Sequence, residues 1–329
     1  MPLLLLAGCS PRVATSFWKI GTEADSLRAG YTVIHAEGKT RHCYPITQWE
    51  DSADVDTYHQ LHHHGVAVES ELMAYRLYFD KKQTIDVYCK RKPQLELAQS
   101  YWYPNDSLLA EGYGDDILRV SGTVGVGSVK YWDGKKMVHV EPVAERSQRI
   151  LKQKKDQATI EVAVKGWQVE GQSENISVQY TMYAGHRDMR CDVYTTHPIE
   201  GLCTGVQTIP AKGGKDTVTI VLPNGILLAS WGTDWPVNDT VKYGKETVGL
   251  GVFIPKEFAG TPVHDKQNNL CLLKEEKKLY TLYKKRYFYS YYTAHFYLNV
   301  CGATKENHPV ATSAEEWLEY LRRWAKTLE

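Results

Sequence analysis

The sequence predicts an all-β protein: a large antiparallel β-supersandwich that ends in a short helix. Apolar and polar residues alternate with a period of two over about fourteen segments, turn residues separate these segments, and only one segment has a helical period. Strands of this kind bury their apolar faces by packing two sheets together. The 329 residues contain no low-complexity linker and are enough for one large core.

The first third of the chain alternates between predicted strands and polar loops. Residues 31–35 have a strand pattern, and residues 49–56 carry four carboxylates and are expected to form an acidic loop. From Val66 to Asp80 the period of two is continuous, so we expect one strand there. Residues 83–89 are expected to be its return strand, although the turn between them has no glycine.

The later strands are plainer, and a helix follows them. Pro223-Asn224-Gly225 separates two alternating segments and predicts a tight hairpin. Ser313 and Glu316 form a capping-box pattern, and the apolar stripe from Trp317 to Trp324 predicts a helix. Further strands are expected at residues 158–169, 176–183, 189–194, 217–222, 226–231, 248–254, 279–283 and 287–300.

The first ten residues resemble the end of a bacterial lipoprotein signal. A short apolar run leads into Leu6-Ala7-Gly8-Cys9, a pattern in which the cysteine is lipidated and becomes the first residue of the mature chain. The basic segment that should precede the run is missing, so an N-terminal strand is the alternative. We expect residues 1–9 to be a signal, residues 10–329 to form one domain, and Cys9 to anchor the protein in the periplasm or at the cell surface.

Charge, aromatic content and cysteine spacing narrow the class of protein. The 39 basic and 39 acidic residues balance, so no overall field draws the chain to nucleic acid or to an anionic membrane. The 22 Tyr and 9 Trp against 6 Phe fit either aromatic strands or rings that stack on sugars. The cysteines form no C-x-x-C pair and are expected to be buried, with disulfides as the alternative outside the cytoplasm.

The segment from Leu61 to Asp80 concentrates the titratable side chains. On one strand face, Glu69 and Glu71 would lie ~7 Å apart, within the ~6.5–9.5 Å of inverting glycosidases. Ordinary ion pairs with Lys or Arg are the alternative for both glutamates. Histidine in such a segment suits general acid–base catalysis. The predicted catalytic residues here are His62, His64, Glu69, Glu71, Tyr75 and Arg76.

Two further chemistries are compatible with these side chains. His62, His64 and Glu69 would suit a divalent metal, but acid–base catalysis is favoured and no cofactor is predicted. Elimination on a uronic acid needs a group that neutralises the carboxylate, a base and an acid, and arginine suits the first task. These roles fit Tyr75, Arg76, His186 and Arg187. A β-turn with exposed charge is the alternative for the last two.

Residues outside this segment are candidates for substrate binding. Trp231 and Trp235 flank a short loop on which a sugar would stack, and His295 shares a predicted strand face with two tyrosines. The glycines after residue 120 do not form a dinucleotide-binding fingerprint, because no strand-to-helix switch surrounds them. The predicted substrate-binding residues are Tyr113, Asp115, Arg187, Trp231, Trp235 and His295.

Several of these motifs together resemble a domain family of unknown function, DUF4861. The matching motifs are His62-His63-His64-Gly65, Glu69-Ser70-Glu71, Ala74-Tyr75-Arg76, Asp80 and Asp115-Asp116-Ile117-Leu118. The resemblance covers residues 17–325 and implies a galactose-mutarotase-like β-sandwich from Bacteroidetes gene clusters that degrade pectic polysaccharides. It implies no catalytic residue, and the segment before Phe17 is short for a complete sandwich.

Two functions are therefore expected. The first is a secreted carbohydrate-active enzyme, a lyase or glycoside hydrolase that acts on acidic, uronate-containing oligosaccharides such as pectin fragments. The second is a glycan-binding lipoprotein without catalysis. Titratable groups that converge in a deep cleft would favour the enzyme, and a flat aromatic platform would favour the binding protein. The expected partner is an oligosaccharide and not nucleic acid, and the membrane is contacted only through a lipid anchor.

Overall fold

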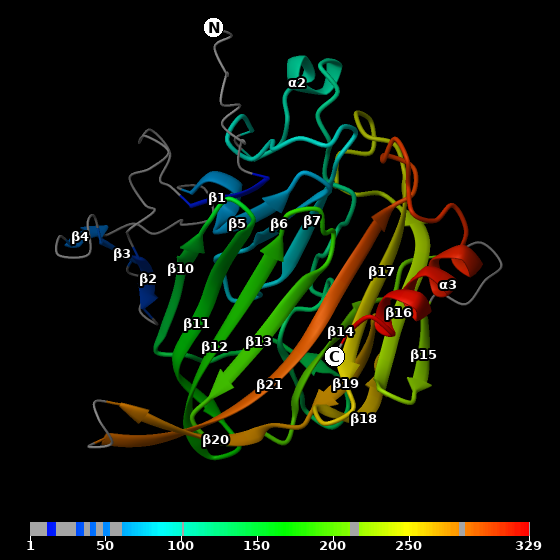
Figure 1. Cartoon of the computed structure of the whole chain (residues 1–329). Coiled ribbons are helices and arrows are strands. Elements are labelled where there is room, and N and C mark those ends of the chain that lie inside the picture. The colour runs from blue at the N-terminus through cyan, green and yellow to red at the C-terminus, as the bar shows by residue number, and fades with distance from the viewer. Residues whose placement is uncertain are drawn as a thin grey trace, which may run out of the picture.

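The regular structure of the protein is mostly β-strand. The computed structural model describes residues 12–17, 31–35, 40–43, 49–52, 61–100, 102–210, 217–282 and 287–328. The strands pair antiparallel in three sheets, and one longer helix lies near the C-terminus (Figure 1). The predicted all-β fold with a C-terminal helix is confirmed.

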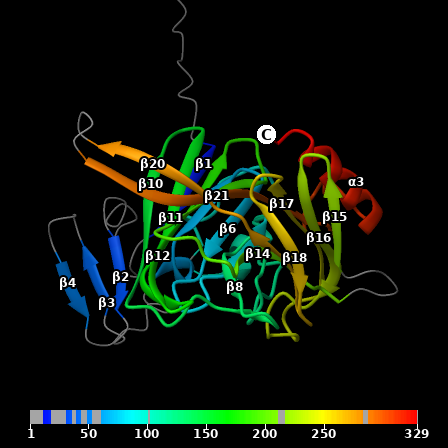
Figure 2. The ribbon, with the colours of Figure 1, turned by 90° about the horizontal axis from the view of Figure 1, so that it is seen from below.

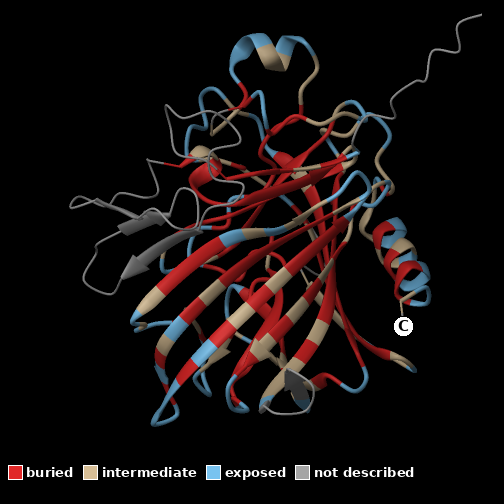
Figure 3. Ribbon diagram, turned by 60° about the vertical axis from the view of Figure 1, so that its left-hand side comes forward, coloured by how far each residue is buried: buried red, intermediate tan, exposed pale blue. Residues whose placement is uncertain are grey.

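A curved twelve-stranded sheet forms the wall of the molecule. Its strand order is β15-β16-β17-β21-β13-β12-β11-β10-β2-β3-β4, and β20 pairs with β21. Figure 2 shows this sheet curving around the smaller sheets, and Figure 3 shows buried and exposed residues alternating along its strands, as expected when one face is solvated. The strands are β2 (Tyr31–His35), β3 (Thr40–Cys43), β4 (Trp49–Ser52), β10 (Glu145–Gln153), β11 (Gln157–Val169), β12 (Gln172–Tyr183), β13 (Met189–Thr195), β15 (Thr217–Leu222), β16 (Gly225–Asp234), β17 (Glu246–Pro255), β20 (Glu276–Leu282) and β21 (Tyr287–Gly302).

Two smaller sheets fill the concave side of the large one. The first has the order β1-β5-β6-β7 and the second the order β18-β19-β14-β8-β9. Their inward apolar residues join those of the large sheet in one core, with Tyr75, Val87 and Val206 fully buried. Their strands are β1 (Val13–Ser16), β5 (Ala67–Ser70), β6 (Met73–Leu77), β7 (Ile85–Cys89), β8 (Lys130–Trp132), β9 (Met137–Val138), β14 (Leu202–Gln207), β18 (Ala259–His264) and β19 (Asn268–Leu273).

Helix α3 (Ala314–Ala325) covers part of the outer face of the large sheet. Ser313 caps it by accepting a hydrogen bond from the Glu316 backbone N–H, as the capping-box pattern predicts. The helix approaches closely because β17 presents glycines to it: a Cβ on Gly249 would lie 2.8 Å from the Trp317 ring. Two shorter helices, η1 (His62–His64) and α2 (Asp106–Ala110), lie in the loops around the small sheet.

Two predictions about local structure are wrong. The segment from Val66 to Asp80 is two strands, because a turn separates β5 from β6. The Ser70 hydroxyl stabilises this turn by accepting hydrogen bonds from the backbone N–H groups of Leu72 and Met73. Both faces of β5 and β6 are buried, so the sequence pattern did not reveal the turn. Residues 49–52 of the predicted acidic loop form β4, and residues 53–60 lie outside the described residues.

The prediction that the cysteines are buried is confirmed for the five whose burial the structure describes. Cys89, Cys191, Cys203, Cys271 and Cys301 are buried free thiols. The predicted signal, residues 1–9 with Cys9, lies outside the described residues. Among the helices of the described part, none has the length and apolar character that a membrane span requires.

Candidate functional site

The outer face of the small sheet β5-β6-β7 carries two groups of buried charges. Glu69 lies opposite Ala74, and Arg76 lies opposite Asp86, so these side chains share the face that points away from the main core. Residues 91–100 and 102–105 cover this face, and Leu97 and Tyr103 pack there against Ala74 and Tyr88. We call Glu69, Lys90 and Glu96 the lysine cluster, and Arg76, Asp86 and Asp116 the arginine cluster.

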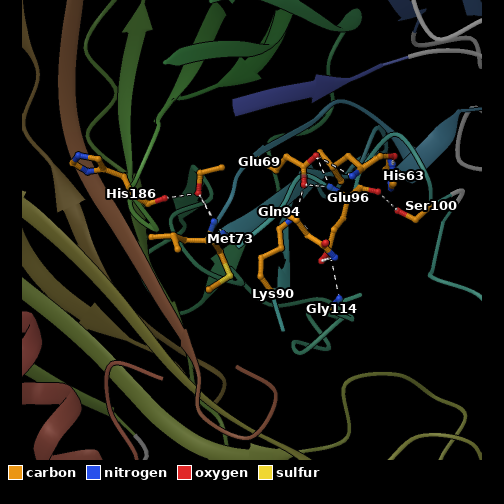
Figure 4. Close-up of polar contacts among 12 residues, drawn as sticks. His63, Glu69, Met73, Lys90, Gln94, Glu96, Ser100, Gly114 and His186 are labelled. Carbon is orange, nitrogen blue, oxygen red and sulfur yellow. Dashed lines mark hydrogen bonds and ion pairs between the residues drawn. The ribbon is translucent and has the colours of Figure 1, made fainter. Parts of the chain in front are cut away.

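The lysine cluster fastens the covering loop to the sheet (Figure 4). Glu69 is fully buried, forms an ion pair with Lys90, and accepts hydrogen bonds from the backbone N–H groups of Glu96 at 2.8 Å and Leu97 at 2.9 Å. Glu96 lies 3.8 Å from Lys90 and accepts a hydrogen bond from the Gly114 N–H at 3.0 Å. Burial raises the pKa of Glu96, although Lys90 opposes the shift. Glu69, a predicted catalytic residue, therefore holds the loop in place.

The three histidines are packed beside this loop. His63 and His64 have left-handed backbone angles, and the Nε2 atom of His63 lies 2.9 Å from the carbonyl oxygen of Leu97. Burial lowers the pKa of His63 to about 3, and it also lowers the pKa of His62. The His64 ring stacks on Trp102, with centroids 5.2 Å apart. In the described part of the chain, no three His, Cys, Asp or Glu side chains lie close enough together to hold a metal ion.

Glu71 and Tyr75 bind partners outside the lysine cluster. The turn after β5 changes the alternation, so Glu69 and Tyr75 lie on opposite faces of the sheet, whereas one continuous strand from Val66 to Asp80 would place them on the same face. Glu71 pairs with Arg12 and accepts a hydrogen bond from the Gly185 N–H, and these contacts lower its pKa against the effect of burial. The buried Tyr75 hydroxyl donates to the Arg187 carbonyl oxygen.

His186 and Arg187 are also engaged in local pairs. His186 Nδ1 lies 3.1 Å from Asp188, and this hydrogen bond raises the pKa of the half-exposed imidazole. Figure 4 shows the His186 ring pointing away from the lysine cluster. Arg187 donates two hydrogen bonds to Glu306, at 3.0 and 2.9 Å. The predicted catalytic residues are thus spread over several places instead of converging.

The arginine cluster surrounds one fully buried cation. The Arg76 guanidinium lies 2.7 Å from Asp86 and 3.5 Å from Asp116, and it donates to the Tyr78 and Tyr103 hydroxyls at 3.1 Å each. It also donates to the Trp102 carbonyl oxygen at 3.1 Å. The rings of three tyrosines pack around it, with centroids 4.8 to 5.1 Å from the guanidinium carbon. Arg76 is thus a positioning residue that orders two phenols and two carboxylates.

A polar pocket opens beside the arginine cluster and contains about 560 Å³ of empty space. Burial raises the pKa of Asp116 well above its ordinary value, and the charge of Asp86 adds to the shift. Burial also raises the pKa of Tyr103 to about 12, although Arg76 opposes this. A carboxyl and a phenol with shifted pKa values in one pocket are typical of acid–base sites. The lining, which we call the Asp116 pocket, consists of Tyr78, Lys82, Tyr103, Asp116, Leu118, Arg119, Val120, Ser121, Pro236, Val237 and Asn238.

The carboxyl group in the pocket belongs to Asp116, whereas the sequence predicts its neighbour Asp115 as a binding residue. Asp115 was a predicted substrate-binding residue, but it lies 3.9 Å from Lys305, whereas Asp116 faces Arg76. Successive side chains of an extended segment point to opposite sides, and Ile117 pairs with Val87 beside β7. The aromatic run at residues 101–103 was a signal for Tyr103, but only the fold places that phenol beside Asp116.

The other predicted binding residues lie in separate places. Trp231 packs with the apolar residues beneath α3, and His295 packs against Phe258 with ring centroids 4.4 Å apart. Tyr113 follows α2 and is partly exposed. Trp235 directly precedes Pro236, Val237 and Asn238, which line the Asp116 pocket. Trp235, a predicted sugar-binding residue, is therefore adjacent in sequence to the lining of this pocket.

The comparisons with known proteins identify the family. The family model described as "Domain of unknown function (DUF4861)" matches residues 24–329. The protein therefore belongs to the DUF4861 family. The comparison with curated proteins finds no match.

Proposed function

We propose that this protein is a carbohydrate-active enzyme that cleaves uronate-containing oligosaccharides, and that the Asp116 pocket binds the reacting sugar. The observation that carries the proposal is that Asp116 and Tyr103 both contact Arg76 at the wall of a polar pocket. Proton-transfer catalysis requires a base and an acid in fixed positions, and Arg76 fixes the positions of both.

Two cations in the pocket fit the carboxylate of a uronic acid. Arg119 and Lys82 line the pocket, and each makes one ion pair of 3.4 Å, with Asp234 and Asp80 respectively. These pairs are partly exposed and therefore weak, so a substrate carboxylate would compete for both cations. The arginine fork suits bidentate binding of a carboxylate.

Elimination fits the lining better than hydrolysis does. Glycoside hydrolases of the common types use two carboxyl groups on either side of the bond. Asp116 is the one carboxyl group among the described residues that line this pocket, and the remaining polar groups are mainly phenols and cations. β-Elimination needs one base and one acid, which Asp116 and Tyr103 supply.

The pKa shifts assign the two roles. Asp116 is a stronger base than an ordinary aspartate once it ionises, and Tyr103 stays protonated up to about pH 12. Asp116 takes the C5 proton of the uronate, the C5–H electrons form the C4–C5 double bond, and the C4–O bond breaks. The departing oxygen receives the Tyr103 proton. Arg119 and Lys82 stabilise the negative charge that develops on the carboxylate.

The test is an assay for the unsaturated product. Polyuronates and their oligomers are incubated with the protein, and the ultraviolet absorbance of the new conjugated double bond is followed. We expect absorbance to rise together with new reducing ends. New reducing ends without absorbance would replace elimination by hydrolysis, and neither signal on any uronate polymer would refute the enzyme.

Glycan binding without turnover is the second candidate. Tyr194 and Tyr291 are partly exposed neighbours on β13 and β21, with ring centroids 5.6 Å apart and ring planes inclined by 60°, and exposed aromatic rings of this kind can stack on sugars. Calorimetry that shows glycan binding in the absence of any cleavage would favour this function. Substitution of Tyr194 by Ala would then abolish binding, whereas the enzyme proposal expects Tyr194→Ala to retain turnover.

The proposed location follows from the N-terminal residues alone. The Leu6-Ala7-Gly8-Cys9 pattern supports a lipid anchor at Cys9 in the periplasm or at the cell surface. Polysaccharide degradation in Bacteroidetes, pectin above all, is the context that we propose for this activity. Loss of membrane association in a Cys9→Ala variant tests the anchor.

A further inference from the structure

A second pocket lies at the opposite end of the hairpin formed by β6 and β7. It contains about 420 Å³ of empty space, and basic residues dominate its lining. We call it the cationic pocket. The residues that matter here are Lys90, Arg91, Lys92, Arg187, Glu71 and Glu306.

Most of these charges are already paired. Lys90 pairs with Glu69, Arg187 with Glu306, and Glu71 with Arg12. Arg91 and Lys92 are different. Their side chains donate to backbone carbonyl oxygens, at 3.5 Å to Leu109 and 2.7 Å to Glu111, and no carboxylate among the described residues lies within ion-pair distance of either. Within the described part of the chain, these two positive charges of the lining therefore have no anionic partner.

The two pockets lie at opposite ends of one strand. Leu72 lines the cationic pocket just before β6, and Tyr78 lines the Asp116 pocket just after it. Six residues of extended chain span roughly 20 Å. Asp115 directly precedes Asp116, which lines the Asp116 pocket, and Lys305 directly precedes Glu306, which lines the cationic pocket. The 3.9 Å contact between Asp115 and Lys305 therefore joins the segments that line the two pockets. A chain of several sugar units is long enough to reach from one pocket to the other.

We propose that the cationic pocket binds the carboxylate of a second uronate in the same substrate chain, several sugars away from the reacting one. This inference rests on the proposed function and names its substrate as an extended oligouronate. Arg91 and Lys92 bind the carboxylate, and the acceptor oxygens of Glu71 and Glu306 bind sugar hydroxyls. Because the pocket combines two cations that, among the described residues, are bonded only to backbone carbonyl oxygens with carboxylate acceptors, it fits a sugar acid better than a bare anion.

The experiment compares a dimer and a hexamer of galacturonate as substrates. The double variant Arg91→Gln with Lys92→Gln is measured against the wild type and against Lys135→Gln with Lys136→Gln. The control removes the same charge from an exposed turn. We expect the double variant to raise KM for the hexamer by about tenfold or more with kcat unchanged, and to leave the dimer unaffected, because each lost carboxylate contact weakens binding only where it forms.

The outcomes separate this inference from the proposed function. If the wild type cleaves both substrates and the double variant alters neither, the cationic pocket is not a subsite and the enzyme stands. If the wild type cleaves nothing, calorimetry with the hexamer decides the matter. Binding that the double variant weakens and the control retains would support the carboxylate site and refute the enzyme, whereas no binding would refute both.

Discussion

The lysine cluster and the arginine cluster are built from the same parts but differ in what lies above them. Each places one buried cation near two buried carboxylates on the outer face of the same small sheet, β5-β6-β7. In each cluster burial raises the pKa of the second carboxyl, Glu96 in one and Asp116 in the other. The backbone N–H of Gly114 and the Gln94 amide bond to Glu96, whereas Asp116 lines a pocket beside Tyr103. A shifted pKa therefore marks a catalytic group only where a substrate can reach it.

The largest expected effects come from removing either cation. We expect Arg76→Met and Lys90→Met each to lower the free energy of unfolding by about 3–5 kcal/mol, because two buried carboxylates then lose the cation that neutralises them. Chemical denaturation measures the loss. Equal losses would show that both clusters stabilise the fold alike. A much smaller loss for one variant would show that its carboxylates escape to water or bind protons.

Substitutions of Asp116 and of Glu96 should differ most in their effect on catalysis. We expect Asp116→Asn to lower kcat for uronate cleavage by about 10²-fold or more, because the base is lost while the side-chain shape is kept. Glu96→Gln is the matched control, with activity near that of the wild type. Steady-state kinetics of the two variants gives the comparison. Full activity in Asp116→Asn would remove this pocket from the mechanism.

The pH dependence of stability offers a weaker but independent test. Asp116 and Glu96 have raised pKa values in the folded state, so folding binds protons, and stability falls as pH rises from the unfolded-state value through the folded-state value. We expect both Asp116→Asn and Glu96→Gln to flatten this fall, which denaturation at several pH values measures. Activity should rise with ionisation of Asp116 and fall toward pH 12, where Tyr103 ionises. A profile that falls as Asp116 ionises would reverse the two roles.

The smallest expected effect on stability concerns two phenols beside Arg76. Tyr88 donates to the Trp102 carbonyl oxygen at 2.7 Å, and that oxygen also accepts from Arg76. We expect Tyr88→Phe to cost about 1 kcal/mol of stability and little activity, because no acceptor is left unpaired. Tyr103→Phe should cost a similar free energy but most of the turnover. Matching losses of turnover in both variants would show that the ring packing, rather than the Tyr103 proton, sustains the reaction.

Much of the fold could be predicted from local patterns. Most of the predicted later strands lie within a few residues of the observed ones, and the Ser313 cap and α3 are where the capping box places them. The hairpin at Pro223 to Gly225 joins β15 to β16 as expected. These elements depend on the local period of apolar residues and on capping residues a few positions apart, and a single sequence contains this information.

The candidate site was only partly predictable. The segment from Leu61 to Asp80 does hold the two clusters, and Glu69 and Arg76 are central to them. The set of residues that share a face was predicted incorrectly, because the turn after Ser70 changes the alternation between β5 and β6. Glu69 and Glu71, two residues apart, therefore bind different partners: Lys90 for the first and Arg12 for the second.

The sequence alone determined that this chain forms a β-sandwich with one terminal helix, that it belongs to its family, and that ionisable groups gather near residue 70. Only the tertiary structure decided which carboxyl faces a pocket. Asp116 reaches Arg76 because the segment after Gly114 pairs with β7, where its partner Tyr88 lies 28 residues earlier in the chain, and no local pattern encodes such a pairing. Burial, cation contact and access to a pocket depend on that pairing, and together they distinguish a structural acid from a candidate catalytic one.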